Sequence, residues 1–172
     1  MLFRSRIVGL DFSEPMLRLA QGKRRSVANP GQTSFILGNA LCSPFQDAVF
    51  DGVITAFVLR NVSDLDLFFS DAFRVLKTGG KLVSVDMFPP SGTLFAQLYG
   101  IYFYRLVPWI GRALAKDPGA YGYLSQSVRE FHTPEAVSEM IQNAGFGRVM
   151  LKKFLNGAVC LHVGEKVANP KP

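Results

Sequence analysis

A short apolar stretch near the start of the chain, Ile7 to Leu10, ends on the carboxylate of Asp11 and passes directly into a helix-forming segment. Its β-branched residues predict a strand buried on both faces, as in parallel sheets. Ser13 can cap the helix that follows, and Pro15 is tolerated in its first turn. This pattern is typical of α/β folds, in which ligands bind outside the carboxyl ends of parallel strands.

Two roles are open for Asp11 on this stretch alone. In nucleotide-binding α/β folds a carboxylate at the end of the second strand accepts hydrogen bonds from both ribose hydroxyls, because it has only acceptor oxygens. The alternative is that Asp11 merely helps to cap its own helix. Short motifs also occur by chance, so both interpretations stand at this point.

The length of 172 residues predicts one domain with a sizeable core. An apolar content of 48% with 19% charged residues excludes a disordered chain, and no apolar run is long enough to span a bilayer. The segment before Ile7 is too short for a signal peptide, which favours the cytoplasm. Cys42 and Cys160 lack metal-site spacing, and we expect both to be buried in a reducing compartment.

The net charge of +6 permits attraction to nucleic acid or to an anionic membrane, but the basic residues are scattered. Only Lys23, Arg24 and Arg25 cluster, at the predicted end of the first helix, where cations interact favourably with the helix dipole. We interpret this cluster as a solvated helix end, with a binding patch as the alternative. We therefore expect no nucleic-acid partner.

The middle of the chain predicts alternating strands and helices. The predicted elements are a helix over 14–25, strands over 33–37 and 50–57, a helix over 63–76 and a strand over 81–87. Such alternation requires right-handed crossovers and a parallel sheet, and the nearly continuous apolar run at 50–57 favours a central strand. Ser63 and Asp66 resemble a capping box, and Gly79 and Gly80 suit a left-handed cap at the helix end.

Residues 90–131 interrupt this alternation with a run of aromatic and aliphatic side chains at helical spacing. A segment this long is either a functional cover or plain core packing, and we expect a helical cover. Thr133 and Pro134 then begin another helix, which runs to about Gly145. Asn156-Gly157 between two apolar runs predicts an antiparallel hairpin that completes the sheet, followed by a polar tail over 168–172.

A parallel sheet with an acid at the end of an early strand and a closing antiparallel hairpin resembles the class I S-adenosylmethionine-dependent methyltransferases. Shorter motifs narrow the resemblance to the ubiquinone/menaquinone biosynthesis C-methyltransferase family, from about Ile7 to Val167. The motifs that carry it are Gly9-Leu10-Asp11, Pro44-Phe45, Phe50-Asp51, Leu59-Arg60-Asn61-Val62, Arg74 to Gly80, Leu106 to Gly111, Tyr123-Leu124 and Ser127-Val128-Arg129. The Leu-Arg-Asn-Val motif is among the more specific of them.

The resemblance implies a Rossmann-like α/β fold, S-adenosylmethionine as cofactor and C-methylation of a prenylated quinol, either demethylmenaquinol or a ubiquinone-precursor benzoquinol. Asp11 would hold the ribose, and Asn39 and Ala40 would lie along the adenine edge. Ala56 would lie beside the methionine portion. No metal site is implied.

The resemblance also implies that Arg60 and Asn61 face the quinol. Carbon methylation needs electron density to move from a phenolic oxygen onto the ring, and a nearby cation favours the phenolate. A guanidinium is a poor proton acceptor, so Arg60 would polarise a phenol or order a water rather than act as a free base. The alternative for Arg60 is a surface ion pair.

The sequence also departs from the family pattern. The family's first strand, its Gly-rich turn and the next helix would precede Ile7, so the domain over 1–167 is expected to be N-terminally truncated and to bind the cofactor weakly or not at all by itself. Leu41, Ala56 and Val58 replace a usual acid, polar residue and glycine. These departures favour an alternative function, a non-catalytic homologue or truncated fragment that binds lipid quinol or partner proteins without methyl transfer.

A nicotinamide-dependent reductase is disfavoured, because the sequence has no dinucleotide-binding glycine fingerprint. Capping or packing is favoured over proton transfer for His132, and a structural role for His162. Asp86, at a strand tip, is expected either to line the pocket or to form a cap or turn. The aromatic segment and basic surface suit loose docking at the inner face of a membrane, and they allow a homo-oligomer or a quinone-biosynthesis complex.

Overall fold

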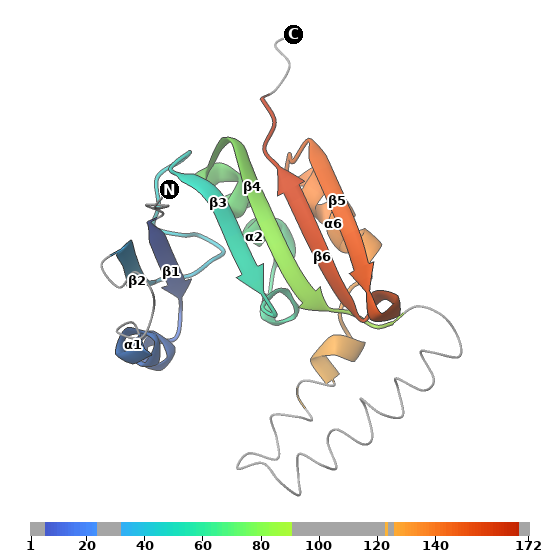
Figure 1. Ribbon diagram of the computed structural model, residues 1–172, viewed down its shortest axis with the longest axis horizontal. Helices are drawn as coiled ribbons and strands as arrows, with labels where there is room; N and C mark the ends of the chain where they lie inside the picture. Colours follow the sequence, from blue (N-terminus) through green and yellow to red (C-terminus); the bar gives the residue numbers. More distant parts are fainter. Residues whose placement is uncertain (1–5, 24–31, 91–122, 124–125, 169–172) are drawn as a thin grey trace, which may run out of the picture. The chain divides into compact units, whose positions relative to one another are not determined.

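The computed structural model of the protein describes residues 6–23, 32–90, 123 and 126–168 (Figure 1). Arg24 and Arg25 of the basic cluster, most of the predicted cover over 90–131 and most of the polar tail over 168–172 lie outside these residues. The chain divides into two compact units, Met1–Gln46 and Asp47–Pro172, and each is described by itself. The single methyltransferase domain over 1–167 stays a prediction.

The first unit is a βαβ element, as predicted. Strand β1 (Ile7–Asp11) and strand β2 (Thr33–Leu37) pair in parallel, and helix α1 (Glu14–Lys23) connects them. Full burial of β1 was a wrong expectation, because Ile7 is 55% exposed and the rest of the strand is half-buried. Among the described residues β1 pairs with β2 alone, and one neighbouring strand and one helix leave part of its apolar surface uncovered.

The second unit contains a four-stranded sheet in the order β3-β4-β6-β5 (Figure 1). Its strands are β3 (Phe50–Ala56), β4 (Leu76–Met87), β5 (Arg148–Phe154) and β6 (Val159–Glu165). Strands β3 and β4 are parallel, whereas β6 is antiparallel to both β4 and β5, so the predicted closing hairpin is confirmed. The predicted central place of β3 is wrong for the described sheet, since β3 lies at its end and Ile54 is 81% exposed.

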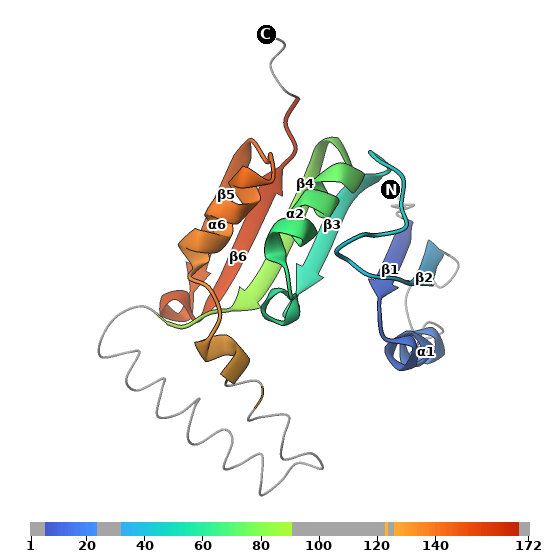
Figure 2. The ribbon, with the colours of Figure 1, turned by 180° about the vertical axis from the view of Figure 1, so that it is seen from behind.

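Two helices, α2 (Leu65–Val75) and α6 (Pro134–Asn143), lie on the same face of this sheet (Figure 2). The apolar stripe predicted for α2 forms the core beneath it, and α6 adds Val137 and Ile141. Residues of α2 and the strands that are buried in this core are Leu65, Phe68, Phe69, Ala72, Val75, Leu76, Leu82 and Cys160. The sheet and the two helices therefore form two layers that enclose one core.

The N-termini of both helices are capped by side chains. Thr133 Oγ1 accepts a hydrogen bond from the backbone of Ala136 at 3.2 Å, as the sequence predicted. The cap of α2 lies one residue later than expected, because Asp64 Oδ1 rather than the Ser63 hydroxyl accepts from Leu67 N at 2.9 Å. Either side chain is a good cap, and the carboxylate also interacts favourably with the helix dipole.

The C-terminal end of α2 has no glycine cap. Leu76 enters β4 at once, and Lys166, directly after β6, donates from Nζ to the carbonyls of Phe73 at 2.7 Å and Leu76 at 2.8 Å. Gly79 does adopt the predicted left-handed conformation, with φ of 81°. It lies within β4, at the irregularity where the pairing of β3 with β4 shifts by several residues.

His162 and Cys160 are buried titratable groups in the core of the second unit. His162 is fully buried between the sheet and α6, and its Nε2 lies 2.9 Å from the carbonyl oxygen of Pro134, so its expected structural role is confirmed. Burial lowers the pKa of His162 and raises the pKa of the Cys160 thiol to about 11. Burial was a wrong expectation for Cys42, which is exposed in the loop after β2.

Within the part of the chain that the structure describes, no helix combines the length and apolarity that a bilayer crossing requires.

The lowered pKa of His162 predicts a pH-dependent stability. Above about pH 6.5, the ordinary pKa of histidine, His162 is neutral in both the folded and the unfolded chain, and its titration does not change the free energy of unfolding. As the pH falls from 6.5 through the lower folded pKa, the unfolded chain binds a proton that the folded chain excludes, so the free energy of unfolding should fall by up to about 1.4 kcal/mol per pH unit. Urea unfolding between about pH 5 and pH 7.5 measures this slope.

Matched histidine variants separate this contribution from other titrations. His162→Leu should remove the His162 part of the slope, although it costs stability at every pH because packing changes. His132→Gln, at an exposed histidine, should keep that part. A His162→Leu protein with the full wild-type slope would contradict the assignment.

Candidate functional site

The motif Leu59-Arg60-Asn61 forms a single 3-10 turn, η3 (Leu59–Asn61), directly after β3. Phe57, between the strand and the turn, has a left-handed φ of 58°, and its backbone N–H donates to the carbonyl of Val85 in β4 at 2.8 Å. A non-glycine residue in this conformation costs of order 1 kcal/mol and persists where the surroundings fix it. The turn therefore lies at the carboxyl ends of the parallel pair β3 and β4, where α/β folds bind ligands.

The turn is held by Asp86, a fully buried carboxylate near the end of β4. Asp86 Oδ2 accepts from the backbone of Leu59 at 2.8 Å, and Oδ1 accepts from Arg60 Nη1 at 2.6 Å and from the backbone of Met87 at 2.8 Å. Of the roles expected for Asp86, the structure shows the turn-forming one. The alternative role for Arg60, a surface ion pair, is wrong, because Arg60 pairs with Asp86 and this ion pair is buried.

Arg60 is nine-tenths buried, with 10% of its side chain exposed, and only part of its guanidinium is satisfied. Its Nε is buried and has no hydrogen-bond partner among the described residues. A buried N–H without an acceptor costs about 1–3 kcal/mol, so such groups are rare unless a ligand or water completes them. The unpaired Nε is therefore an unsatisfied group of the folded chain, and only the exposed tenth of the Arg60 side chain is open to a ligand.

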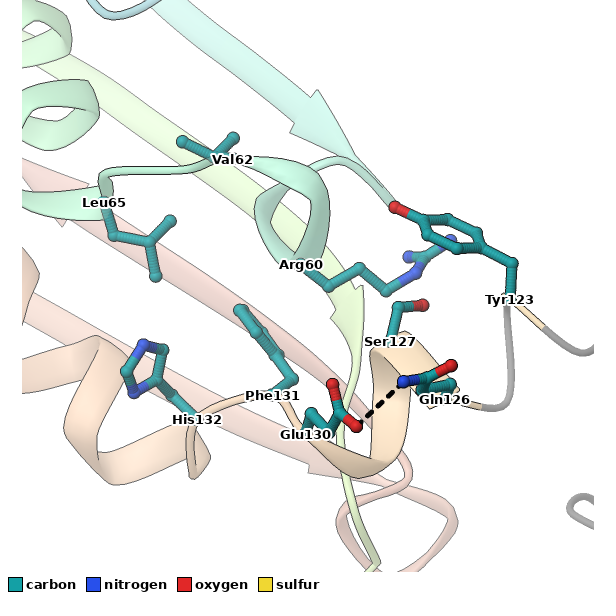
Figure 3. Close-up of a pocket in the computed structure, with 9 residues that line it drawn as sticks. All are labelled: Arg60, Val62, Leu65, Tyr123, Gln126, Ser127, Glu130, Phe131 and His132. Carbon is teal, nitrogen blue, oxygen red and sulfur yellow. Dashed lines mark hydrogen bonds between the residues drawn. The ribbon is translucent and has the colours of Figure 1, made fainter.

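Arg60 lines a cavity of about 400 Å³ (Figure 3). The lining combines apolar and polar side chains: Arg60, Val62, Leu65, Tyr123, Gln126, Ser127, Glu130, Phe131 and His132. In Figure 3 Arg60 and Tyr123 lie at one end and His132 at the other. The volume falls within the range of small-molecule sites, and the lining has more polar than apolar side chains.

Asn61, the neighbour of Arg60, is connected to this cavity through Tyr123. The Tyr123 hydroxyl donates to Asn61 Oδ1 at 3.0 Å. The sequence analysis did not assign a role to Tyr123 or Glu130. The signal that could have found Tyr123 was its place in one of the motifs that carry the family resemblance.

Three of the residues predicted to bind the cofactor lie together in the first unit, at the carboxyl ends of β1 and β2. The backbone carbonyl of Asp11 accepts from Gly38 N at 3.0 Å, immediately before Asn39 and Ala40. Asp11 Oδ1 accepts from the backbone of Ser13 at 2.8 Å, which is the contact expected for helix capping. In the part of the chain described, Oδ2 has no hydrogen-bond partner and stays available to hydroxyl groups, so Asp11 fits a ribose as well.

Ala56, the fourth predicted cofactor residue, is the exposed last residue of β3, two residues before Val58. It belongs to the second unit, with Arg60 and Asn61. Its methyl group can pack against a ligand but cannot donate or accept a hydrogen bond. In the described ranges no group of three side chains suited to metal binding occurs.

The sequence matches the ubiE/COQ5 methyltransferase family over residues 2–166. The demethylmenaquinone methyltransferase of Thermus thermophilus is 38% identical over 160 residues, which are 93% of this chain and 71% of that protein. The mitochondrial 2-methoxy-6-polyprenyl-1,4-benzoquinol methylase of Bos taurus is 34% identical over 163 residues, which are 95% of this chain but only 49% of that protein.

Solved structures support the fold. A S-adenosylmethionine-dependent methyltransferase from Thermotoga maritima matches with a TM-score of 0.63 at 19% identity, over 92% of this chain and 72% of that one. The Haemonchus contortus phosphoethanolamine N-methyltransferase 2 in complex with S-adenosylmethionine matches with a TM-score of 0.66 at 16% identity, over 95% of this chain and 44% of that one. The predicted Rossmann-like methyltransferase fold is thereby confirmed.

The buried pair predicts strong energetic coupling between Arg60 and Asp86. Asp86→Asn and Arg60→Met should each lower the free energy of unfolding by about 3–5 kcal/mol, because each leaves the other charge buried and unpaired. The double variant Arg60→Met/Asp86→Asn should lose less than the sum of the two single losses, by about 1–3 kcal/mol. Urea unfolding of the four proteins measures the coupling.

An exposed ion pair provides the control for this cycle. Lys77 Nζ lies 2.7 Å from Asp51 Oδ1, and both side chains are largely open to solvent. Lys77→Met should therefore cost less than about 1 kcal/mol. Strictly additive losses at positions 60 and 86 would show that the pair does not act as a unit.

Proposed function

Because the chain belongs to the ubiE/COQ5 methyltransferase family, we propose that it transfers a methyl group from S-adenosylmethionine to a ring carbon of a prenylated quinol. The observation that carries the proposal is the buried Arg60 turn, which opens into a cavity of about 400 Å³ with apolar and polar walls. The names of the relatives provide two substrate classes, a demethylated menaquinol and a polyprenyl benzoquinol. Both are apolar rings that carry a hydroxyl.

The side chain of Arg60 supplies the electrostatic part of the reaction. As the ring carbon attacks, negative charge moves away from the phenolic oxygen, and a phenolate donates this charge more readily than a neutral phenol. Arg60 lines the cavity and is nine-tenths buried, so its positive charge stabilises that phenolate. Because Arg60 stays protonated, it lowers the phenol's affinity for its proton but does not take the proton itself, which passes to water.

The carboxyl ends of β1 and β2 suit the nucleoside part of the cofactor. Asp11 has a carboxylate oxygen available for ribose hydroxyls, and the exposed Asn39 and half-buried Ala40 follow on the neighbouring strand end. When bound, S-adenosylmethionine supplies a methyl group on a positively charged sulfur. The chain's own contribution there is to bind and orient.

We further propose that the protein acts at the cytoplasmic face of a membrane, where prenylated quinols dissolve. The net charge of +6 supports loose docking at an anionic surface. The alternative of a non-catalytic homologue remains an outcome of the tests below, because the exposed Ala56 offers no polar contact.

The first test concerns Asp11. Asp11→Asn keeps the shape of the side chain but removes its charge, so affinity for S-adenosylmethionine should fall by about 1.5–3 kcal/mol, the range for hydrogen bonds to charged groups. Turnover at saturating cofactor should change little. Calorimetry measures the affinity in the 172-residue chain and in a chimera that carries, ahead of Ile7, a relative's strand, Gly-rich turn and helix. Unchanged affinity in the chimera would leave Asp11 with its capping role alone.

The second test concerns Arg60. Arg60→Ala should lower turnover by about two to three orders of magnitude while cofactor affinity stays near that of the parent, because the cation that favours the phenolate is lost. Arg60→Lys should recover part of the turnover, since its point charge lacks the guanidinium fork. Methyl incorporation into a prenylated quinol is the measurement, and thermal unfolding checks that each variant is folded at the assay temperature.

Two outcomes would count against the proposal. Full turnover of Arg60→Ala would make Arg60 structural. Quinol binding without any methyl transfer in the chimera would favour the non-catalytic alternative.

A further inference from the structure

Tyr123 determines which atoms of the Asn61 amide remain available. Its hydroxyl donates to Asn61 Oδ1 at 3.0 Å, so the acceptor end of the amide is occupied. The amide nitrogen Nδ2 carries two N–H donors. Among the described residues, none accepts from this nitrogen, so the side chain of Asn61 presents donors and no free acceptor of comparable strength.

Arg60 is arranged in the same way. Asp86 binds its Nη1 at 2.6 Å, and its buried Nε–H is left without a partner. Two consecutive residues of one turn thus each have one group tied to a supporting side chain, and each keeps N–H donors that have no partner among the described residues. A ligand oxygen that accepts from both residues must offer two lone pairs, and the positive charge of Arg60 favours an anionic oxygen over a neutral one.

We propose that Tyr123 is a positioning residue, which fixes the Asn61 amide so that Asn61 Nδ2 donates to a phenolate oxygen held beside the Arg60 guanidinium. This inference rests on the proposed function, because the phenolate is that of the quinol. A phenolate oxygen accepts two or three hydrogen bonds, and charge-assisted donors are the strongest available to it. The apolar side of the cavity, formed by Val62, Leu65 and Phe131, then faces the ring.

Tyr123 is suited to an unambiguous test because it contributes little to the core. It is 59% exposed, and a hydrogen bond at such a site adds little to the stability of the fold. Tyr123→Phe removes one hydroxyl and keeps the ring. We therefore expect its free energy of unfolding to stay within about 0.5 kcal/mol of wild type, the usual range for surface substitutions.

The experiment uses the full chain without cofactor and the probe 4-nitrophenol, whose absorbance distinguishes phenol from phenolate. Wild type should bind the phenolate more tightly than the phenol and so lower the apparent pKa of the bound probe. Tyr123→Phe should weaken phenolate binding about 3- to 10-fold and leave phenol binding unchanged. Ser138→Ala, which also removes one hydroxyl but outside the cavity, should behave as wild type.

Asn61→Ala provides the decisive comparison. If Tyr123 acts through Asn61, Tyr123→Phe should have no further effect on phenolate binding in the Asn61→Ala background. Independent, additive losses would overturn the inference, as would wild-type phenolate binding by Tyr123→Phe or a wild-type chain that does not prefer the phenolate. Asn61→Asp keeps the acceptor for Tyr123 but removes the donors, and it should lose phenolate binding as Asn61→Ala does or more.

The same variants separate this inference from the proposed function. In the chimera, Tyr123→Phe should shift the pH at which methylation reaches half its maximum upward, without changing the affinity for S-adenosylmethionine. Phenolate binding with the expected variant pattern but no methyl transfer would uphold the positioning role and reject the proposed function. Methyl transfer with an unshifted pH profile in Tyr123→Phe would reject the positioning role alone.

Discussion

The carboxylate of Asp86 is the contact on which the candidate site depends. It lies at the end of β4, yet two of its three hydrogen bonds go to the turn that follows β3. The position of Arg60 is therefore set by the neighbouring strand rather than by its own turn. A buried ion pair contributes little to stability compared with apolar side chains of the same volume, so its value here lies in fixing the direction of one cationic donor.

The rest of the site follows from the same parallel pair of strands. Because β3 and β4 run in the same direction, the Phe57 backbone, the Leu59–Asn61 turn and Asp86 reach one edge together. The 126–132 segment adds polar and aromatic side chains to the opposite wall of the cavity. A donor-rich edge thus faces a wall of mixed character, in which Phe131 offers apolar surface to an aromatic ring beside the polar Gln126 and Glu130.

The sequence predicted those parts of the fold that depend on local pattern. The stripe of α2 and the Asn156-Gly157 hairpin depend on neighbours a few residues apart, and both were confirmed. Strand neighbours are not encoded locally, so a continuous apolar run could not show that β3 lies at the end of its sheet. The cap of α2 differed by one residue because Ser63 and Asp64 can both cap a helix.

The candidate site likewise combines residues that a local motif indicates with residues that are distant in sequence. Arg60 and Asn61 were found from a motif of four adjacent residues. Their supporting residues are distant in sequence, since Asp86 lies 26 positions after Arg60 and Tyr123 lies 62 positions after Asn61. Only the register of β3 with β4 brings Asp86 to the turn, and that register shifts within β4 at a point which no local pattern indicated.

The order β3-β4-β6-β5 has a consequence for synthesis on the ribosome. Of the described strands, β6 is made last, yet it is an inner strand, and β5 has no partner in the described sheet until β6 arrives. The final residue of β6 is followed by Lys166, whose ammonium binds the carbonyls of Phe73 in α2 and of Leu76 directly after it. While β6 is still inside the exit tunnel, the emerging polypeptide therefore holds an incomplete sheet, in which β5 and β4 have open edges that invite aggregation.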